Sequence, residues 1–401
     1  MSVLRSRRFQ LLSVFLALIA ATLVISSVFS QRRGRGGNRF SEMERRGLAQ
    51  PFRGISTNGE MEHGLFSIEA TGVSTKPVVD AAAAFLSALT EEQRGRTTFP
   101  VDDEEWRKWA NQHSYIRQGV SFEELDERQR EAGFALMKTS LSARGFKQSR
   151  DIMRLNYTLG ELTSNFEELD EWFYYLTVLG EPSEDKPWGW QVDGHHLIIN
   201  YFVLGDQVVM TPTFMGSEPV IAEGGKYKGV AVMQDELRRG LHLAQSLTPA
   251  QRAKAVIQTE KTGNNALAEA FKDNLDLDYA GISAGDLSEA QQGLLLSVVD
   301  GFVGHMSDGH AKVRMDEVRD HLDRTRFAWI GGFEDDSVFY YRVHSPVVLI
   351  EFDHQRPIFM RLPRVPQRQH VHAVMRTPNG NDYGKDLLRQ HYERSHRAEL
   401  D

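Results

Sequence analysis

Two histidines one residue apart, His370 and His372, are the strongest candidates for chemistry in this 401-residue chain. On a β-strand, residues two apart point to the same side, so both imidazoles would face one ligand. Imidazole nitrogens bind zinc, manganese and iron, and a metal held in this way lowers the pKa of a bound water. The alternative is a pair of solvated or hydrogen-bonded strand residues that bind no metal.

A second pair, His195 and His196, follows Gly194 at the predicted start of a strand. Adjacent strand residues point to opposite faces, so the two rings would reach the same ligand only if the strand bends at the glycine. We favour His196 as a metal ligand, because it would share the more polar face of the strand with Asn200. His195 and Asn200 remain further candidates.

Carboxylates and guanidinium groups supply the other candidate site residues. Glu351 and Asp353 would share one face of a strand, with Glu351 as a fourth metal ligand and Asp353 as a general base or as the partner of a ligand. The alternative for both is a solvated face or an arginine partner. Arg342 and Arg376 are predicted to anchor an anionic group of the substrate.

One further candidate pair lies near the C-terminus. Asp382 and Lys385 follow the turn residues Pro378-Asn379-Gly380, and they would serve as a base and an anion anchor. The alternative is that Asp382 caps the next helix and Lys385 is solvated.

Several common chemistries are excluded or disfavoured. The chain has no cysteine, which excludes disulfides and thiolate metal sites. It contains no dinucleotide-binding or Walker motif, no Gly-x-Ser-x-Gly and no His-Glu-x-x-His, so we expect no nucleotide cofactor and no zincin or α/β-hydrolase. A net charge of −8 argues against nucleic-acid binding.

The elements that must position these residues are arranged in two similar runs. Each run reads as helices followed by an aromatic-rich hairpin, with one helix predicted over about 121–144, a short one near 149–162, another near 313–323, and hairpins over 188–214 and 327–353. The segments at 85–94 and 243–252 resemble each other. We therefore predict an α+β fold of two halves, about 74–225 and 226–395, related by internal duplication around a shared antiparallel sheet or cleft. The alternative is chance, because a hydroxyl residue three before glutamine is a common helix start.

The N-terminus has the pattern of an export signal. Arg5, Arg7 and Arg8 precede an apolar run over residues 9–29, which ends in small residues. The run is also long enough to span a bilayer, so an uncleaved anchor is the alternative. An Arg/Gly-rich linker follows over residues 31–73. We expect a periplasmic or secreted protein that contacts a membrane only through this segment, if it is uncleaved.

Several strings resemble the DUF3500 family, a domain of unknown function. They are Trp188-Gly-Trp-Gln, Gly194-His-His, Thr211-Pro-Thr-Phe, Ile350-Glu-Phe-Asp, His370-Val-His and Asp382-Tyr-Gly-Lys-Asp. The resemblance covers about residues 75–395. It implies a bacterial protein with one continuous domain, and it implies no activity.

Together these patterns predict an exported metal-dependent hydrolase that acts on a small or carbohydrate-like substrate. Its zinc, manganese or iron ion would be held by four residues: His196, Glu351, His370 and His372. One alternative is a non-enzymatic module that binds a small-molecule or carbohydrate ligand, with the aromatic cluster around Trp172 and Trp188 as its platform. Another is a metal-dependent oxidoreductase with the same ligands.

Overall fold

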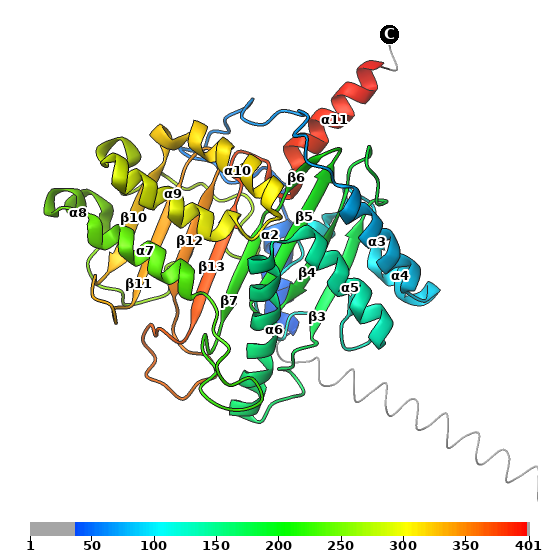
Figure 1. Cartoon of the computed structure of the whole chain (residues 1–401), viewed down its shortest axis with the longest axis horizontal. Helices are drawn as coiled ribbons and strands as arrows, with labels where there is room; N and C mark the ends of the chain where they lie inside the picture. Colours follow the sequence, from blue (N-terminus) through cyan, green and yellow to red (C-terminus); the bar gives the residue numbers. More distant parts are fainter. Residues whose placement is uncertain (1–36, 399–401) are drawn as a thin grey trace, which may run out of the picture.

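The computed structural model describes residues 37–398 and builds them around one 13-stranded mixed sheet (Figure 1). The strands are β1 Thr98–Phe99, β2 Val120–Ser121, β3 Tyr174–Leu179, β4 Trp188–Gly194, β5 Leu197–Leu204, β6 Gln207–Val209, β7 Thr213–Ser217, β8 Val256–Gln258, β9 Ile282–Ser283, β10 Arg326–Gly331, β11 Phe339–His344, β12 Leu349–His354 and β13 Val371–Arg376. Their order is β1-β3-β4-β5-β7-β13-β12-β11-β10-β8, with β2, β6 and β9 paired to β3, β5 and β10.

Ten α-helices accompany the sheet in the described part of the chain. They are α2 Gly37–Leu48, α3 Lys76–Ala88, α4 Glu91–Thr97, α5 Glu127–Ser140, α6 Ala143–Thr163, α7 Gln234–Ser246, α8 Pro249–Ala255, α9 Glu289–Val303, α10 Asp308–Asp320 and α11 Lys385–Ala398. Short 3-10 helices span Glu104–Arg107, Ala284–Asp286, Leu322–Arg324 and Asp382–Gly384. The α+β class predicted from the sequence is confirmed.

The sheet is mixed, which corrects the expectation of an antiparallel one. The short outer strands β1 and β8 pair in parallel with β3 and β10, whereas the pairs between them are antiparallel. Parallel neighbours need a long crossover connection. Residues 100–173 form such a connection between β1 and β3, and residues 259–325 form one between β8 and β10.

The two faces of the sheet differ in what covers them. Helices α3, α5, α6, α7, α9 and α10 lie on one face, whereas α2 lies on the other (Figure 1). Tyr341 marks the helical face, because its hydroxyl donates to the Glu236 carbonyl of α7 and its ring stacks on Phe352. The alternating residues Glu351 and Asp353 therefore point to the opposite face.

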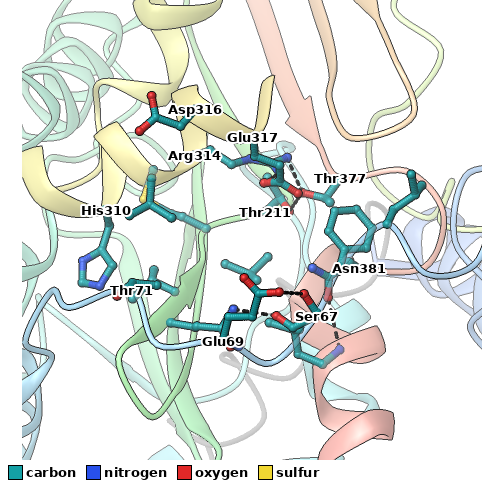
Figure 2. Close-up of a pocket in the computed structure, with 18 of the residues that line it drawn as sticks. Ser67, Glu69, Thr71, Thr211, His310, Arg314, Asp316, Glu317, Thr377 and Asn381 are labelled. Atoms are coloured by element: carbon teal, nitrogen blue, oxygen red, sulfur yellow. Dashed lines mark hydrogen bonds and ion pairs between the residues drawn. The ribbon is translucent and has the colours of Figure 1, made fainter. Parts of the chain in front are cut away.

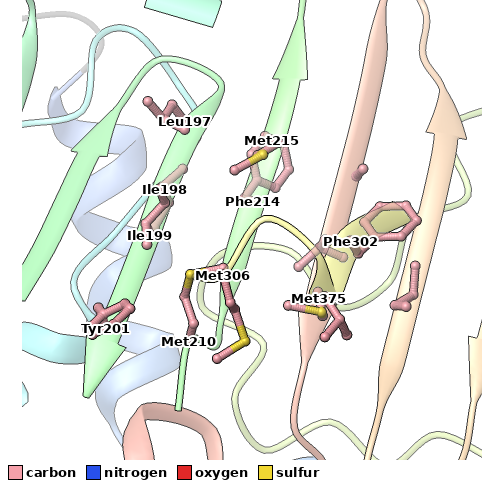
Figure 3. Packing of buried hydrophobic residues seen from close by; sticks show 14 of the residues in the cluster. Leu197, Ile198, Ile199, Tyr201, Met210, Phe214, Met215, Phe302, Met306 and Met375 are labelled. Atoms are coloured by element: carbon pink, nitrogen blue, oxygen red, sulfur yellow. The ribbon is translucent and has the colours of Figure 1, made fainter. Parts of the chain in front are cut away.

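The helical face forms the core near the centre of the sheet. Figure 3 shows methionines gathered around β7 and β13, together with residues from β5 and from the end of α9. Met210, Met215, Met306 and Met375 are all buried there. Unbranched, polarizable side chains fill such irregular junctions between elements well.

The helix predicted over 121–144 is shorter than expected. Helix α5 starts at Glu127, because the Asp126 side chain accepts a hydrogen bond from the Gln129 amide, and it ends at Ser140. Gly145, just beyond the predicted end, lies in the first turn of α6, which Ser142 caps. The glycine is required by packing, because a Cβ there would lie 2.3 Å from the His305 carbonyl oxygen.

The same capping arrangement occurs in both halves of the chain. Helices α4, α5, α8 and α9 all begin with a capping box that ends in glutamine. The glutamines pair across neighbouring helices: Gln129 donates to Gln93 over 2.8 Å, and Gln291 donates to Gln251 over 2.9 Å.

The predicted export segment over residues 9–29 lies outside the described residues. Within residues 37–398, no helix combines the length and the apolar character needed to cross a membrane.

Candidate metal centre

Three histidines, His196, His370 and His372, meet at one end of the two central strands. Their Nε2 atoms form a nearly equilateral triangle, with separations of 3.1 Å, 3.1 Å and 3.2 Å. All three residues are buried. They are the one group of three or more potential metal ligands among the described residues whose ligand atoms lie this close together.

His370 and His372 are placed by strand β13. His370 directly precedes the strand and His372 is its second residue, so the two imidazoles lie on one side, as the one-residue gap predicts. His372 faces Gly216 across the β7–β13 ladder. A Cβ on Gly216 would lie 2.3 Å from the Val371 carbonyl oxygen, so the close approach of the strand beside the histidines requires glycine here.

His196 reaches the site from a turn, which differs from the strand position expected. His195 and His196 form the connection between β4 and β5, and His196 has a left-handed backbone with φ of 63°. The turn carries both rings to the same side, where they stack at 4.0 Å. His195 itself bonds to Asn156 through Nδ1 over 2.7 Å, so it supports the His196 ring and is not part of the triangle.

The outer nitrogens of two of the histidines have acceptors as partners. His370 Nδ1 lies 2.7 Å from the Arg356 carbonyl oxygen, and His372 Nδ1 lies 2.7 Å from the Glu269 carboxylate. Since carbonyl and carboxylate oxygens only accept, each Nδ1 carries a proton. In the neutral rings each Nε2 then presents a lone pair toward the centre of the triangle.

Burial keeps His196 and His370 in the neutral form that binds metals. Burial first, and then the neighbouring histidines, hold the pKa of His196 and His370 well below the usual range. Two neutral nitrogen lone pairs that face each other at 3.1 Å repel, unless a cation lies between them. The arrangement is therefore suited to a metal ion.

The structure places Glu351 outside this triangle. Its carboxylate accepts hydrogen bonds from the Leu267 and Ala268 amides and from the Tyr340 hydroxyl, at 2.9 Å, 2.8 Å and 2.6 Å. With its oxygens occupied in this way, Glu351 holds the covering segment 264–271 against the sheet. Burial raises the pKa of this carboxyl.

Asp353 has a similar position. It faces His372 across the β12–β13 ladder, but its carboxylate accepts from the Asn265 and Ala266 amides and pairs with Lys261 at 2.9 Å. Burial raises the pKa of Asp353. Asp353 therefore fastens the same covering segment, which carries Glu269 to His372.

The predicted anion anchors have protein partners. Arg376 is fully buried and bonds to Asp382 at 2.7 Å and to Asp273 at 2.6 Å. Arg342 donates to the Asp278 carbonyl oxygen over 3.2 Å. These guanidinium groups connect the sheet to the segments that cover it.

The remaining candidates also bond within the protein. Asp382 accepts from Arg376 and from the Thr377 amide. Asn200 bonds to Gln191 and to the Pro212 carbonyl oxygen, and Lys385 Nζ lies 3.4 Å from the Asp102 carbonyl oxygen. None of these three belongs to the triangle.

Two residues of the site carry no signal in the sequence. Glu269 lies in an irregular segment, and nothing in its neighbourhood predicts its contact with His372. Glu218 follows β7, where its carboxylate accepts from the Ile358, Phe359 and Met360 amides and lies 3.7 Å from His370 Nδ1.

No curated protein and no solved structure is detectably similar to this chain. The family model described as "Protein of unknown function (DUF3500)" matches residues 71–385, which include all three histidines and the segment that bears Glu269. That match spans most of the chain, and the protein therefore belongs to the DUF3500 family.

Proposed function

We propose that His196, His370 and His372 hold a divalent transition metal ion and that the protein is a metal-dependent hydrolase of a small or carbohydrate-like substrate. One observation carries the proposal: the Nε2 lone pairs of His370 and His372 face each other at 3.1 Å, while both Nδ1 atoms donate outward. A metal ion between the two nitrogens would remove this repulsion, because both lone pairs would then bind the ion.

The triangle has the size that three ligands of one ion require. At a zinc–nitrogen distance of about 2.0–2.1 Å and tetrahedral angles, ligand nitrogens lie about 3.4 Å apart. The observed separations of 3.1–3.2 Å fall slightly below this value. Three protein ligands leave a coordination position for water, as in catalytic zinc sites, whereas structural sites use four.

The surrounding residues fit a catalytic role for such an ion. The Glu269 carboxylate fixes the orientation of the His372 ring and makes it a stronger ligand. Its side chain is 26% exposed, so the site is reachable from solvent on this side. A bound metal ion would supply a hydroxide nucleophile at neutral pH.

Metal analysis of the purified full-length chain tests the site. We expect about one equivalent of zinc, manganese or iron per chain, lost in both His370→Ala and His372→Ala. The exposed His242 on α7 provides the matched control, because His242→Ala removes an imidazole that does not belong to the triad. A metal-free wild-type protein whose melting temperature does not change on addition of Zn²⁺ or Mn²⁺ contradicts the proposal.

Assays on model substrates test the reaction. We expect hydrolysis of 4-nitrophenyl esters or glycosides whose rate rises with pH near 7, as a metal-bound water ionises. Activity should disappear with a chelator and return with added metal. A metal that is bound but changes oxidation state without hydrolysis would favour the oxidoreductase alternative, and binding of sugars without turnover would favour the ligand-binding module.

We also propose that the two halves arose by internal duplication and that the protein is exported. The order of elements and the paired capping glutamines support duplication. If it holds, Gln129→Ala and Gln291→Ala should destabilise the protein to a similar extent. The basic and apolar pattern of residues 5–29 supports export, which cell fractionation with and without residues 1–30 tests.

A further inference from the structure

A second cavity, separate from the histidine triad, opens at the other end of the central strands. Its volume is about 370 Å³, within the range of small-molecule sites. The segment 65–71, strand β6 and helices α10 and α11 contribute to its lining, and Thr211 and Thr377 lie between them (Figure 2). Thr211 lies five residues before Gly216, and Thr377 lies five residues after His372. Five residues of extended strand span roughly 17 Å.

The inner wall of the cavity presents hydrogen-bond donors. Arg314 donates to the Thr377 hydroxyl over 3.0 Å, and the Thr377 and Thr211 hydroxyl oxygens lie 2.7 Å apart. A guanidinium group only donates, so the arrangement that uses every donor has Thr377 donating to Thr211. The Thr211 hydroxyl then directs its own hydrogen into the cavity, which it lines.

Asn381 adds a second inward donor. The residue is only 3% exposed, and its Oδ1 accepts from the Leu387 amide. Its amide nitrogen points into the cavity in Figure 2 and has no hydrogen-bond partner among the described residues. This amide is therefore available to donate to an acceptor on a ligand in the cavity.

The opposite side of the cavity carries a carboxylate. Glu69 lies across from Arg314 (Figure 2), where it accepts from Ser67. The carboxylates of α10 lie on the Arg314 side, where Glu317 pairs with Arg314 itself and Asp316 pairs with Lys312 and Arg319. The Glu69 carboxylate repels anions and accepts hydrogen bonds. An ammonium ligand would satisfy Glu69 but offers no acceptor to Thr211 and Asn381. Hydroxyl groups both donate and accept, and so satisfy both sides.

We propose that this cavity binds a small neutral polyhydroxylated molecule of mono- or disaccharide size. Acceptors of the ligand meet Thr211 and Asn381, and hydroxyl donors meet Glu69. Apolar side chains of the lining, including Met210, Met306 and Val313, cover the carbon faces of the ligand. The site differs from the proposed metal centre in residues, position and chemistry, and it does not depend on a bound metal.

Saturation-transfer NMR on the full-length chain tests the proposal with glucose, galactose, maltose and cellobiose as probes. We expect transfer to at least one sugar and at least a tenfold weaker affinity in Thr211→Val, which keeps the shape of the side chain but removes the donor. Glu69→Gln, at an exposed position, should weaken binding of the same sugar. If Thr211→Val does not fold, the sugar affinity of Glu69→Gln tests the proposal in its place.

His370→Ala separates this site from the proposed metal centre. We expect it to leave sugar binding unchanged, while Thr211→Val leaves the metal content unchanged. Absence of transfer to all four sugars overturns the proposal, and so does equal binding by wild type and Glu69→Gln. If only His370→Ala abolishes sugar binding, the sugar binds at the histidine triad, and this result also overturns the proposal.

Discussion

At the scale of single residues, the outer partners of the histidines decide what the triad does. Glu269 and the Arg356 carbonyl hold the protons of His372 and His370 on Nδ1, so that the inner nitrogens are free to bind. The backbone carbonyl cannot be changed by substitution. Glu269 is therefore the position at which this control can be tested.

We predict that Glu269→Gln weakens zinc binding by about 10- to 100-fold without abolishing it, because an amide is a weaker acceptor than a carboxylate. Competition with a fluorescent chelator measures the affinity. Glu60→Gln, at an exposed residue, is the matched control. An affinity equal to that of the wild type would show that Glu269 does not tune His372.

A buried carboxyl away from the triad predicts how stability depends on pH. Burial raises the pKa of Glu105 from its ordinary value of 4.5 to about 7. Between these values the folded protein keeps a proton that the unfolded chain has released, so the free energy of unfolding falls as pH rises. A shift of this size corresponds to about 3 kcal/mol.

Glu105→Gln should remove this part of the pH dependence. Urea unfolding of wild type and variant at pH 5 and pH 8 measures it: the variant should gain stability relative to the wild type as pH rises through this window. Glu91→Gln, at an exposed helix start, should leave the difference unchanged. Parallel curves for wild type and Glu105→Gln would contradict the assignment.

The sequence predicts residues of the triad better than their partners. The one-residue gap between His370 and His372 predicts that both side chains lie on the same side of the strand, because the alternation of side chains along a strand is a local property. Glu269 meets His372 across 103 positions of the chain, so only the fold brings them together. Glu351 and Asp353 share a face as predicted, but the covering segment that occupies them has no recognisable local pattern.

At the scale of elements, an irregular segment covers a charged sheet face. Residues 261–268 contain no regular strand or helix, yet their amides are bound by Glu351 and Asp353. Two buried carboxylates thus replace the pairing that a strand or helix would provide. The segment continues directly to Glu269, so its attachment positions the partner of His372.

We predict that Glu351→Gln destabilises the protein by about 2 kcal/mol, because an amide cannot accept from all three donors. Hydrogen exchange should rise in residues 264–271, and zinc affinity should fall through the loosened Glu269. Tyr340→Phe, which removes one donor to the same carboxylate, should cost about 1 kcal/mol. Loss of metal with unchanged exchange in this segment would instead make Glu351 a ligand.

Local signals predict helix starts and hairpins but not the edges of the sheet. The hydroxyl and glutamine pairs at Thr90 and Thr248 mark helices that do begin there. The parallel pairs of β1 with β3 and of β8 with β10 join residues far apart in the chain. Strands of two or three residues carry too short a pattern to be recognised from the sequence.

At the scale of the whole molecule, the site belongs to neither half alone. His196 comes from the first half and His370 and His372 from the second, and the halves meet where β7 pairs with β13. The ladder between these strands runs from Thr213 to Ser217 and is buried. The proposed metal centre therefore depends on the association of the halves, whereas the covalent link between them lies at the surface.

This arrangement predicts the behaviour of a nicked chain. Gly224 and Gly225 are exposed in the connection between the halves, so a protease site inserted between them allows one specific cut. We expect both fragments to stay together after cleavage, to retain the wild-type metal content and to unfold in one transition, because the shared sheet outweighs the lost peptide bond.

Each fragment expressed alone should bind no metal, since neither contains three histidine ligands, and mixing the two should restore binding. Size-exclusion chromatography with metal analysis of nicked, separate and mixed fragments measures this. Metal retained by the second fragment alone would mean that His370 and His372 use a ligand other than His196. That result would replace the composite centre with a site contained in one half of the sheet.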